Sequence, residues 1–482
     1  MLVVQVHHRV AVLSVAGLAF APPAAAHGLA ERYALPIPLP LYLAGAAATV
    51  AVSFALLAVF ARREWRADYP RYDLSRWRLL RALASPGVLL GCRLAALALL
   101  ALIVAAAFLG PQSPFKNLAP VMVWVIGWVG LAFLCVLVGD VWNLLSPWST
   151  VFTWAEALAA RLRPGRRLAL ARPWPARLGA WPAVGLFLVF AWLELVWPGR
   201  DHPRSLGAAL LVYSALTWTG MLVFGREAWL GGGDPLAIFF RLLARFAPAE
   251  IVTSGATGPR VIVRPPAVGL LTEEPVHCSI LVFVLVVLST VTFDGFTETP
   301  LWSAIRDTLL GGQPERLALS LGLLAFPLLF LGLYLLFARL MARATAHSRP
   351  ASELGRRFVL TLLPIAIAYH IAHYLPFLLL AGQLVIPLAS DPFGRGWDLF
   401  GTALYRLDVG VVDARFIWFT AVAAIVAGHV VSIVLAHATA GRLFAGSRLA
   451  LRSQYPLLVL MVTYTMVSLW ILAQPVVETA PG

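Results

Sequence analysis

The sequence predicts an all-α polytopic membrane protein, a helix bundle of about ten transmembrane spans that follows a signal peptide. Of its 482 residues, 60% are hydrophobic and only 12% are charged, and the mean hydropathy is +0.83. A water-soluble domain of this composition would have too little polar surface to face solvent. Long runs of Leu, Ala, Val and Phe recur instead, at lengths that suit a hydrocarbon core about 30 Å thick.

Ten apolar segments are long enough to cross a bilayer. They cover residues 41–61, 86–109, 119–139, 179–198, 205–225, 277–296, 317–342, 358–383, 415–438 and 455–475. Amphipathic stretches between some of them predict short interfacial helices on the cytoplasmic side.

The basic residues are distributed unevenly between the two sets of loops. Of the 37 Lys and Arg residues, 26 fall in one set of alternating loops and nine in the other. Arg9 in the leader and Arg93 within a span are the remaining two. Cytoplasmic loops carry such an excess of positive charge, so the arginine-rich set is predicted to face the cytoplasm. The net charge of +14 therefore reflects topology, and the expected partner is the lipid bilayer, with no nucleic acid.

Residues 1–26 have the pattern of a secretory signal peptide. Arg9 precedes an apolar run, and an A-x-A cleavage site ends at Ala26. Cleavage there would leave residues 27–482 as a single multi-span domain whose first residue, His27, lies outside the cytoplasm. A first-position histidine can chelate a metal ion through its α-amine and a ring nitrogen, a geometry that suits copper.

Three cytoplasmic stretches are predicted to form helices that lie on the membrane surface, and two of them have a capping signal. Asp234 is suited to cap the first of these helices and Pro235 to occupy its first position. Apolar residues then follow helical spacing up to residue 246, with arginines on another side. Thr153 and Glu156 predict a capping box for a similar helix after the third span.

The exits of the third and fifth spans resemble each other. Each has a glycine, an acidic residue, a tryptophan and a later proline, at residues 139–148 and 225–235. Such echoes occur in transporters built from duplicated helices. The preference of tryptophan for membrane interfaces explains the echo equally well.

Ionisable side chains inside membrane spans are costly unless they are paired, and they mark candidate functional sites. Counting the helical rise from the flanking arginines places a group of them in the outer half of the bilayer or near its middle. The group consists of Glu194, Asp294, His370, His373 and His429. Tyr464 and Ser468 share one face of the last span.

The spacing of His370 and His373, three residues apart, puts both rings on one helical face, where they could converge on one ion. Histidine nitrogen with carboxylate oxygen is a ligand set for zinc or non-haem iron. A divalent ion in an outward-open cavity, whether zinc, iron or copper, would lower the pKa of a bound water molecule. Glu194 or Asp294 would then act as the catalytic group that accepts the proton of this water.

Other interpretations of these residues remain open. Intramembrane histidines can simply connect helices by hydrogen bonds, and chains of acidic residues and histidines can relay protons. Haem ligation by His370 and His429 is a third possibility, because both are expected near the middle of neighbouring helices.

A long outer loop at residues 389–408 contains an Asp-Pro turn and several glycines. Arg395, Trp397 and Phe400 would form an amphipathic rim. The pattern predicts either a lid over an outer cavity or an ordinary interfacial loop with aromatic anchors.

Three segments carry a resemblance to a known family. They are residues 27–41, which contain Leu-Pro-Ile-Pro-Leu-Pro, residues 369–374, Tyr-His-Ile-Ala-His-Tyr, and residues 390–397, Ser-Asp-Pro-Phe-Gly-Arg-Gly-Trp. Together they resemble a bacterial family of polytopic membrane proteins commonly named fenitrothion hydrolase, over most of the mature chain. The resemblance implies hydrolysis of an organophosphate phosphotriester, a small-molecule substrate. It assigns no catalytic residues, and the sequence contains no metallohydrolase signature such as HExxH.

Two alternative functions belong to other classes. A transporter or copper-handling permease would use the polar layer as its substrate site and His27 as a port for the metal. A haem-binding membrane subunit would use His370 and His429. The expected location in every case is the bacterial cytoplasmic membrane, with the mature amino terminus outside.

Overall fold

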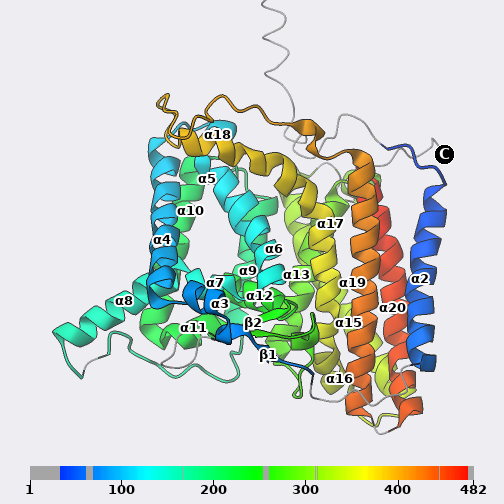
Figure 1. Ribbon diagram of the computed structural model, residues 1–482. Coiled ribbons are helices and arrows are strands. Elements are labelled where there is room, and N and C mark those ends of the chain that lie inside the picture. The colour runs from blue at the N-terminus through cyan, green and yellow to red at the C-terminus, as the bar shows by residue number, and fades with distance from the viewer. Residues whose placement is uncertain are drawn as a thin grey trace, which may run out of the picture.

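The computed structural model describes residues 33–60, 69–165, 167–252, 260–309, 311, 313–444 and 446–475. In this part of the chain, nine helical segments are long and apolar enough to cross a membrane, and they stand side by side in one bundle (Figure 1). The uninterrupted ones are α2 (Leu39–Phe60), α4 (Pro86–Leu109), α10 (Pro203–Phe224), α13 (Cys278–Thr297), α15 (Glu315–Ala344), α19 (Ala414–Leu443) and α20 (Ser447–Ala473). The predicted all-α membrane bundle is therefore confirmed. The predicted signal peptide and His27 lie outside the described residues.

Two of the nine spans change their helical geometry along their length. The third predicted span consists of α5 (Leu118–Pro120), the wide-turned π-helix η4 (Val121–Gly130) and α6 (Leu131–Val138). The eighth consists of α16 (Ala351–Phe358), the 3-10 turn η6 (Val359–Leu362), α17 (Leu363–Ala381), η7 (Gly382–Leu384) and α18 (Val385–Ser390). Long π-helical stretches are rare and occur mostly at functional sites, so η4 directs attention to its neighbours.

The fourth predicted span, the one predicted span that is not among these nine, is the short helix α9 (Trp181–Leu195). Its 15 residues are fewer than the roughly 20 that cross a hydrocarbon core. Phe187 and Ala191 are each 2% exposed, because α9 packs against α13 and against α12 (Pro235–Ala244). One face of this short helix is thus buried in the protein, while Val189 on the opposite face is 53% exposed; its last turn carries Glu194.

Helix α12 differs from its prediction. It begins as expected, since Asp234 accepts a hydrogen bond from the backbone N–H of Ala237 at 2.8 Å and Pro235 occupies the first position. Instead of lying on the membrane surface, however, α12 is buried among α6, α9 and α17. Phe239 and Phe240 are 3% and 1% exposed. The apolar face that suits a lipid surface here packs against protein.

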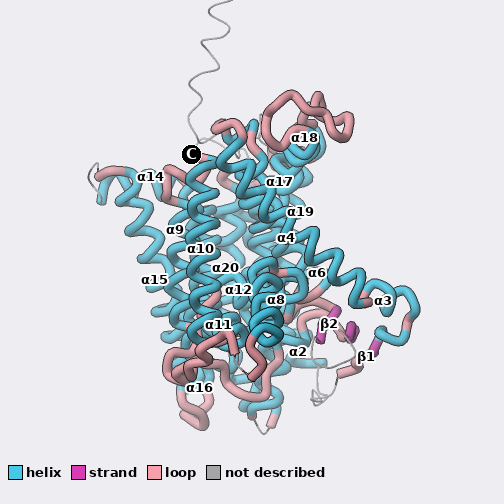
Figure 2. Tube along the Cα trace, turned by 90° about the vertical axis from the view of Figure 1, so that its left-hand side faces the viewer, coloured by secondary structure: helices cyan, strands magenta, loops and turns pink. Residues whose placement is uncertain are grey.

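The remaining elements lie mainly at the two ends of the bundle. They are α3 (Arg78–Leu83), α7 (Val141–Leu145), α8 (Pro147–Leu162), α11 (Arg226–Gly232) and α14 (Pro300–Leu309), with the antiparallel strands β1 (Tyr72–Asp73), β3 (Arg260–Val263) and β2 (Ala249–Val252), paired in that order. Figure 2 places α14 and α18 at one end and α16 and the strands at the other. The second end carries the arginine-rich loops and is called the predicted cytoplasmic end below. The opposite end is the predicted outer end.

The resemblance between the two span exits extends to their structure. Helices α6 and α10 both end at a glycine with positive φ, Gly139 at 130° and Gly225 at 89°. A short helix follows each glycine, α7 or α11. A capping residue and a proline then start a second helix, Ser146-Pro147 for α8 and Asp234-Pro235 for α12. The predicted capping box of α8 is wrong, because the helix starts six residues earlier than Thr153.

The two copies of this motif contact each other reciprocally. The residue after the first glycine, Asp140, lies within electrostatic reach of Arg241, six places after the proline of α12. The residue after the second glycine, Arg226, donates a hydrogen bond of 2.9 Å to Thr153, six places after the proline of α8. Likewise α8 packs on α4 and α10, while α12 packs on α9 and α6. These reciprocal contacts indicate an internal repeat. Its two units are α6–α7–α8 and α10–α11–α12, and the last helix of each unit packs on the first helix of the other.

The cap of α12 offers a test of how much this inserted helix contributes to stability. Asp234 is 1% exposed and accepts hydrogen bonds from Ala237 N and Tyr213 Oη. We expect Asp234→Ala to lower the free energy of unfolding by about 2 kcal/mol, whereas Asp234→Asn keeps the accepting oxygen and the cap. Thermal unfolding in detergent, followed by tryptophan fluorescence, measures both. Equal melting temperatures for the two variants would contradict this role.

The same pair of variants tests a pH effect. Burial raises the pKa of Asp234 above its ordinary value. The folded protein then holds this proton more tightly than the unfolded chain, so the wild type gains stability as the pH falls through that raised pKa toward the ordinary pKa of the unfolded chain. The melting temperature of Asp234→Asn is expected to lack this part of the pH dependence.

Candidate functional site

Three helices bring four of the polar intramembrane side chains together. Glu194 comes from α9, Asp294 from α13, and His373 and Tyr374 from α17. Tyr374 Oη lies 2.8 Å from Asp294 Oδ2 and 3.5 Å from Glu194 Oε1. His373 Nε2 lies 2.9 Å from the same Asp294 oxygen. These four residues form one connected set, called the outer network below because it lies toward the predicted outer end.

Local sequence places the two carboxylates near the ends of their helices. Glu194 is one residue before the end of α9, and Asp294 is three residues before the end of α13. Arg200 Nη1 donates hydrogen bonds to the carbonyls of Glu194 and Leu195, at 3.0 and 3.1 Å, and so satisfies the carbonyl end of α9. The indole of Trp124 donates to the Arg200 carbonyl at 2.9 Å. This cation therefore lies at a fixed place beside the Glu194 end of the network.

The geometry of the outer network suits a chain of directed hydrogen bonds. A protonated Glu194 can donate to the Tyr374 oxygen, and Tyr374 then donates to Asp294. His373 Nε2–H donates to Asp294 from the other side when the ring carries its proton there. One proton shared by the two carboxyl groups thus gives every donor an acceptor and leaves a single negative charge next to His373.

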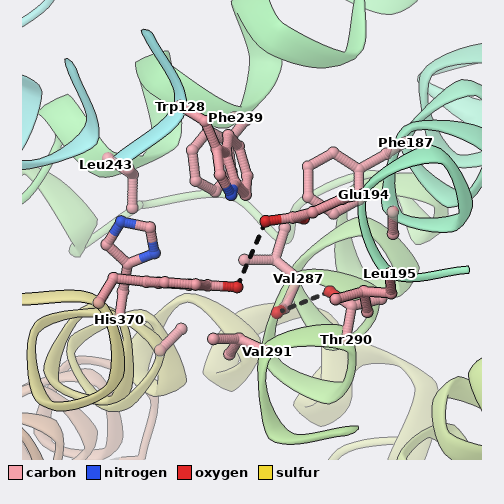
Figure 3. Close-up of a pocket in the computed structure, with 13 residues that line it drawn as sticks. Trp128, Phe187, Glu194, Leu195, Phe239, Leu243, Val287, Thr290, Val291 and His370 are labelled. Carbon is pink, nitrogen blue, oxygen red and sulfur yellow. Dashed lines mark hydrogen bonds between the residues drawn. The ribbon is translucent and has the colours of Figure 1, made fainter. Parts of the chain in front are cut away.

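A small cavity borders the Glu194 side of the network (Figure 3). Its volume of about 20 Å³ is enough for one or two water molecules. Most of its wall is apolar, and its polar lining residues are Trp128, Glu194, Thr290, His370 and Tyr374. The indole nitrogen of Trp128, from the π-helix η4, points toward the Glu194 carboxylate (Figure 3). Phe239 and Leu243 of α12 form part of the apolar wall.

One further carboxyl group lies beside the network, nearer the predicted outer surface. Glu298 follows the end of α13 and interacts electrostatically with Asp294, His373 and Arg200. Burial, and then the negative charge of Asp294, raise the pKa of Glu298 above its ordinary value. Its carboxyl group is only partly covered by the protein, and the residue as a whole reaches solvent, so it is placed to exchange protons between solvent and the buried carboxyl groups.

Of the other two candidate histidines, His370 borders the cavity on the side away from Asp294, whereas His429 is not among the residues that line it. His370 packs against Trp128 and Phe133, with ring centroids 6.0 and 5.7 Å apart, so it faces away from the Asp294 side where His373 binds. His429 is fully buried and packs near Tyr464 at 6.0 Å. The two rings contact different helices, which gives no support to a haem held between them.

The metal prediction gains no support from the residues that the structure describes. Among them, no three His, Cys, Asp or Glu side chains are grouped so that they could hold one ion. His373 and Asp294 are hydrogen-bonded to each other. His27 lies outside the described residues, so a copper site at the amino terminus stays a prediction.

The outer loop packs away from the network. Gly394 lies so close to Pro111 that a Cβ at this glycine would be 2.3 Å from the proline ring. Phe393 packs on the cluster formed by α4, α5 and η4, and Arg395 lies over the rings of Phe393 and Trp397. None of the described residues that line the cavity belongs to this loop. The loop is therefore an aromatic-anchored cover of the α4–α5 turn.

Two residues of the site were not among the predicted candidates. Tyr374 is the hydroxyl that joins the carboxylates, and Trp128 points at one of them. Neither carries a charge at neutral pH, so neither has the sequence signal that marked Glu194, Asp294 and the histidines. The signal that could have identified Tyr374 is its place in Tyr369-His370-Ile-Ala-His373-Tyr374, where two further polar rings share the same helical turn.

No protein-family model, no curated protein and no solved structure matches this chain, so the comparisons assign it to no family and its site must be interpreted from its own geometry.

Proposed function

We propose that this chain is a secondary transporter that binds and releases a proton at the outer network. The observation that carries the proposal is the Tyr374 hydroxyl, which lies between two carboxyl groups and hydrogen-bonds to both. Chains of acidic residues and histidine inside membrane bundles mark proton relays in pumps and transporters. The substrate that moves with the proton is a small molecule whose chemistry stays open.

The number of charges favours one exchangeable proton. Two carboxylates close together in a water-poor interior repel each other, so they tend to share a proton. His373 and Arg200 are near enough to offset part of this negative charge. Loss of the shared proton would leave two negative charges on either side of Tyr374, a change large enough to alter how α9, α13 and α17 pack.

The architecture supports transport as well. Parallel or inverted repeats, and helices that cross only part of the bilayer, recur in secondary transporters, with the site at the interface between repeats. Here η4, α9 and α12 of the repeated region form one part of the cavity wall, and α13 and α17 form the rest.

Hydrolysis is the second candidate, favoured by the family resemblance and by one feature of the cavity. A water molecule there would lie beside the Glu194 carboxylate, which could accept its proton. The metal-assisted form would need ligands beyond the residues that the structure describes. Release of nitrophenol from fenitrothion by purified protein, with and without added zinc, would favour this candidate, provided that Glu194→Gln abolishes it.

A pH jump on proteoliposomes adsorbed to a solid-supported membrane tests proton binding without knowledge of the substrate. Proton entry into a buried site displaces charge and gives a transient current. We expect the wild type to give this transient and Asp294→Asn to reduce it to the level of protein-free vesicles. Asp307→Asn, in the exposed end of α14, is the matched control and should behave as the wild type. A wild-type transient no larger than that of empty vesicles would overturn the proposal.

A further inference from the structure

A second group of buried polar side chains lies between α13, α17, α19 and α20. Its centre is the hydroxyl of Tyr464, which is hydrogen-bonded to Thr292 and lies near the ring of His429. Tyr369 and Ser468 also lie within electrostatic reach of Tyr464. We call this group the Tyr464 cluster; its members are Thr292, Tyr369, His429, Tyr464 and Ser468.

Three atoms of the cluster have no hydrogen-bond partner among the described residues. They are Tyr369 Oη, His429 Nε2 and Ser468 Oγ, and each belongs to a side chain that is 0% exposed. Buried polar atoms are nearly always satisfied, by protein or by ordered water. Three unsatisfied atoms around one hydroxyl therefore point to a shared ligand.

The chemistry of these atoms identifies the ligand class. His429 Nδ1 lies 2.8 Å from the Ile425 carbonyl, so Nδ1 carries the hydrogen and Nε2 of the neutral ring accepts. The hydroxyls of Tyr369 and Ser468 can each donate and accept. A ligand that both donates and accepts, carries no charge and makes about three hydrogen bonds is water.

We propose that the Tyr464 cluster binds ordered water inside the bundle, and that this water extends the hydrogen-bonded chain of the outer network toward the middle of the membrane. The two groups adjoin at Tyr369, one helical turn before His373 on α17. A Cβ at Gly295, next to Asp294, would lie 2.5 Å from Tyr369 Oη, so this hydroxyl reaches the backbone beside the network. His429 lies halfway along α19. The inference that water binds here does not depend on the proposed function. Only the role of this water in proton movement rests on the proposed function.

Radiolytic hydroxyl labelling of the full chain in liposomes tests the water directly, because X-rays generate hydroxyl radicals from ordered water beside a side chain. We expect Tyr369 and Tyr464 to be labelled severalfold faster than Tyr334. Tyr334 is the matched control, since it is 3% exposed and its hydroxyl is already bound to the Gly355 carbonyl at 2.7 Å. Labelling of Tyr369 and Tyr464 at the Tyr334 rate would overturn the inference, and this comparison needs no variant.

Two variants separate this inference from the proposed function. Tyr464→Phe and His429→Leu each remove a polar atom that water would contact, and labelling of Tyr369 should fall toward the Tyr334 rate. Tyr455→Phe, on the exposed side of the same helix α20, should leave it unchanged. Water labelling without a pH-jump transient would uphold the inference and reject the proposed function. A pH-jump transient without water labelling would reject the inference and uphold the proposed function.

Discussion

Tyr374→Phe is expected to slow proton exchange between the two carboxyl groups of the outer network by about ten- to a hundredfold. The variant removes a hydrogen bond to a carboxylate, an interaction worth about 1.5–3 kcal/mol, while it keeps the aromatic ring that packs against His370 and His373 at 4.8 and 4.7 Å. Glu194 and Asp294 would then have no hydroxyl between them. The decay rate of the pH-jump transient measures the exchange.

The control for this variant is Tyr334→Phe. It deletes the same hydroxyl group from another buried tyrosine, one that binds a backbone carbonyl of α16. Both variants are expected to lose some thermal stability, but only Tyr374→Phe should change the transient. If both leave its amplitude and decay unchanged, Tyr374 is a structural link between helices and carries no proton.

The bundle itself was largely predictable from hydropathy. Each predicted span coincides with a helix or a chain of helices, because a membrane span must be a long apolar run that satisfies its own backbone. The bounds of the eighth and tenth spans are off by up to seven and eight residues, since α16 to α18 and the start of α20 extend beyond the apolar runs. Helix α12 shows where this reasoning stops. A ten-residue helix with an apolar face has the same pattern whether that face meets lipid or protein, and only the packing of α6, α9 and α17 around it distinguishes the two.

The level of the candidate residues along their helices was predictable from the sequence, but the neighbours that their side chains face were not. The rise per residue places Glu194, Asp294, His373 and His370 in one layer. Which of them meet depends on how the helices rotate and cross. His373 faces Asp294 on α13, whereas His370, three residues earlier, faces Trp128 on η4. A spacing of three residues allows two rings to bind one ion, yet here each ring contacts a different helix.

The rotation of α17 depends on a close contact with α19, and Gly428 is the residue that permits it. A Cβ at Gly428 would lie 2.4 Å from the Cβ of Ala368 and 2.7 Å from the carbonyl oxygen of Pro364. Neither atom belongs to a flexible side chain, so the helices themselves would have to separate. Small residues at such crossings let transmembrane helices approach closely.

We therefore expect Gly428→Ala to lower the free energy of unfolding by about 2–3 kcal/mol through overpacking. Gly441→Ala, on the same helix with nothing near its added Cβ, should be neutral or slightly stabilising, because alanine favours a helix by up to about 1 kcal/mol over glycine. The same methyl group is thus expected to change stability in opposite directions, and thermal unfolding in detergent measures both. If the two variants melt alike, the α17–α19 contact is loose, and the orientation of His373 and Tyr374 must be set by other helices. If Gly428→Ala melts early and also loses the pH-jump transient, the crossing of these two helices is what holds the outer network together.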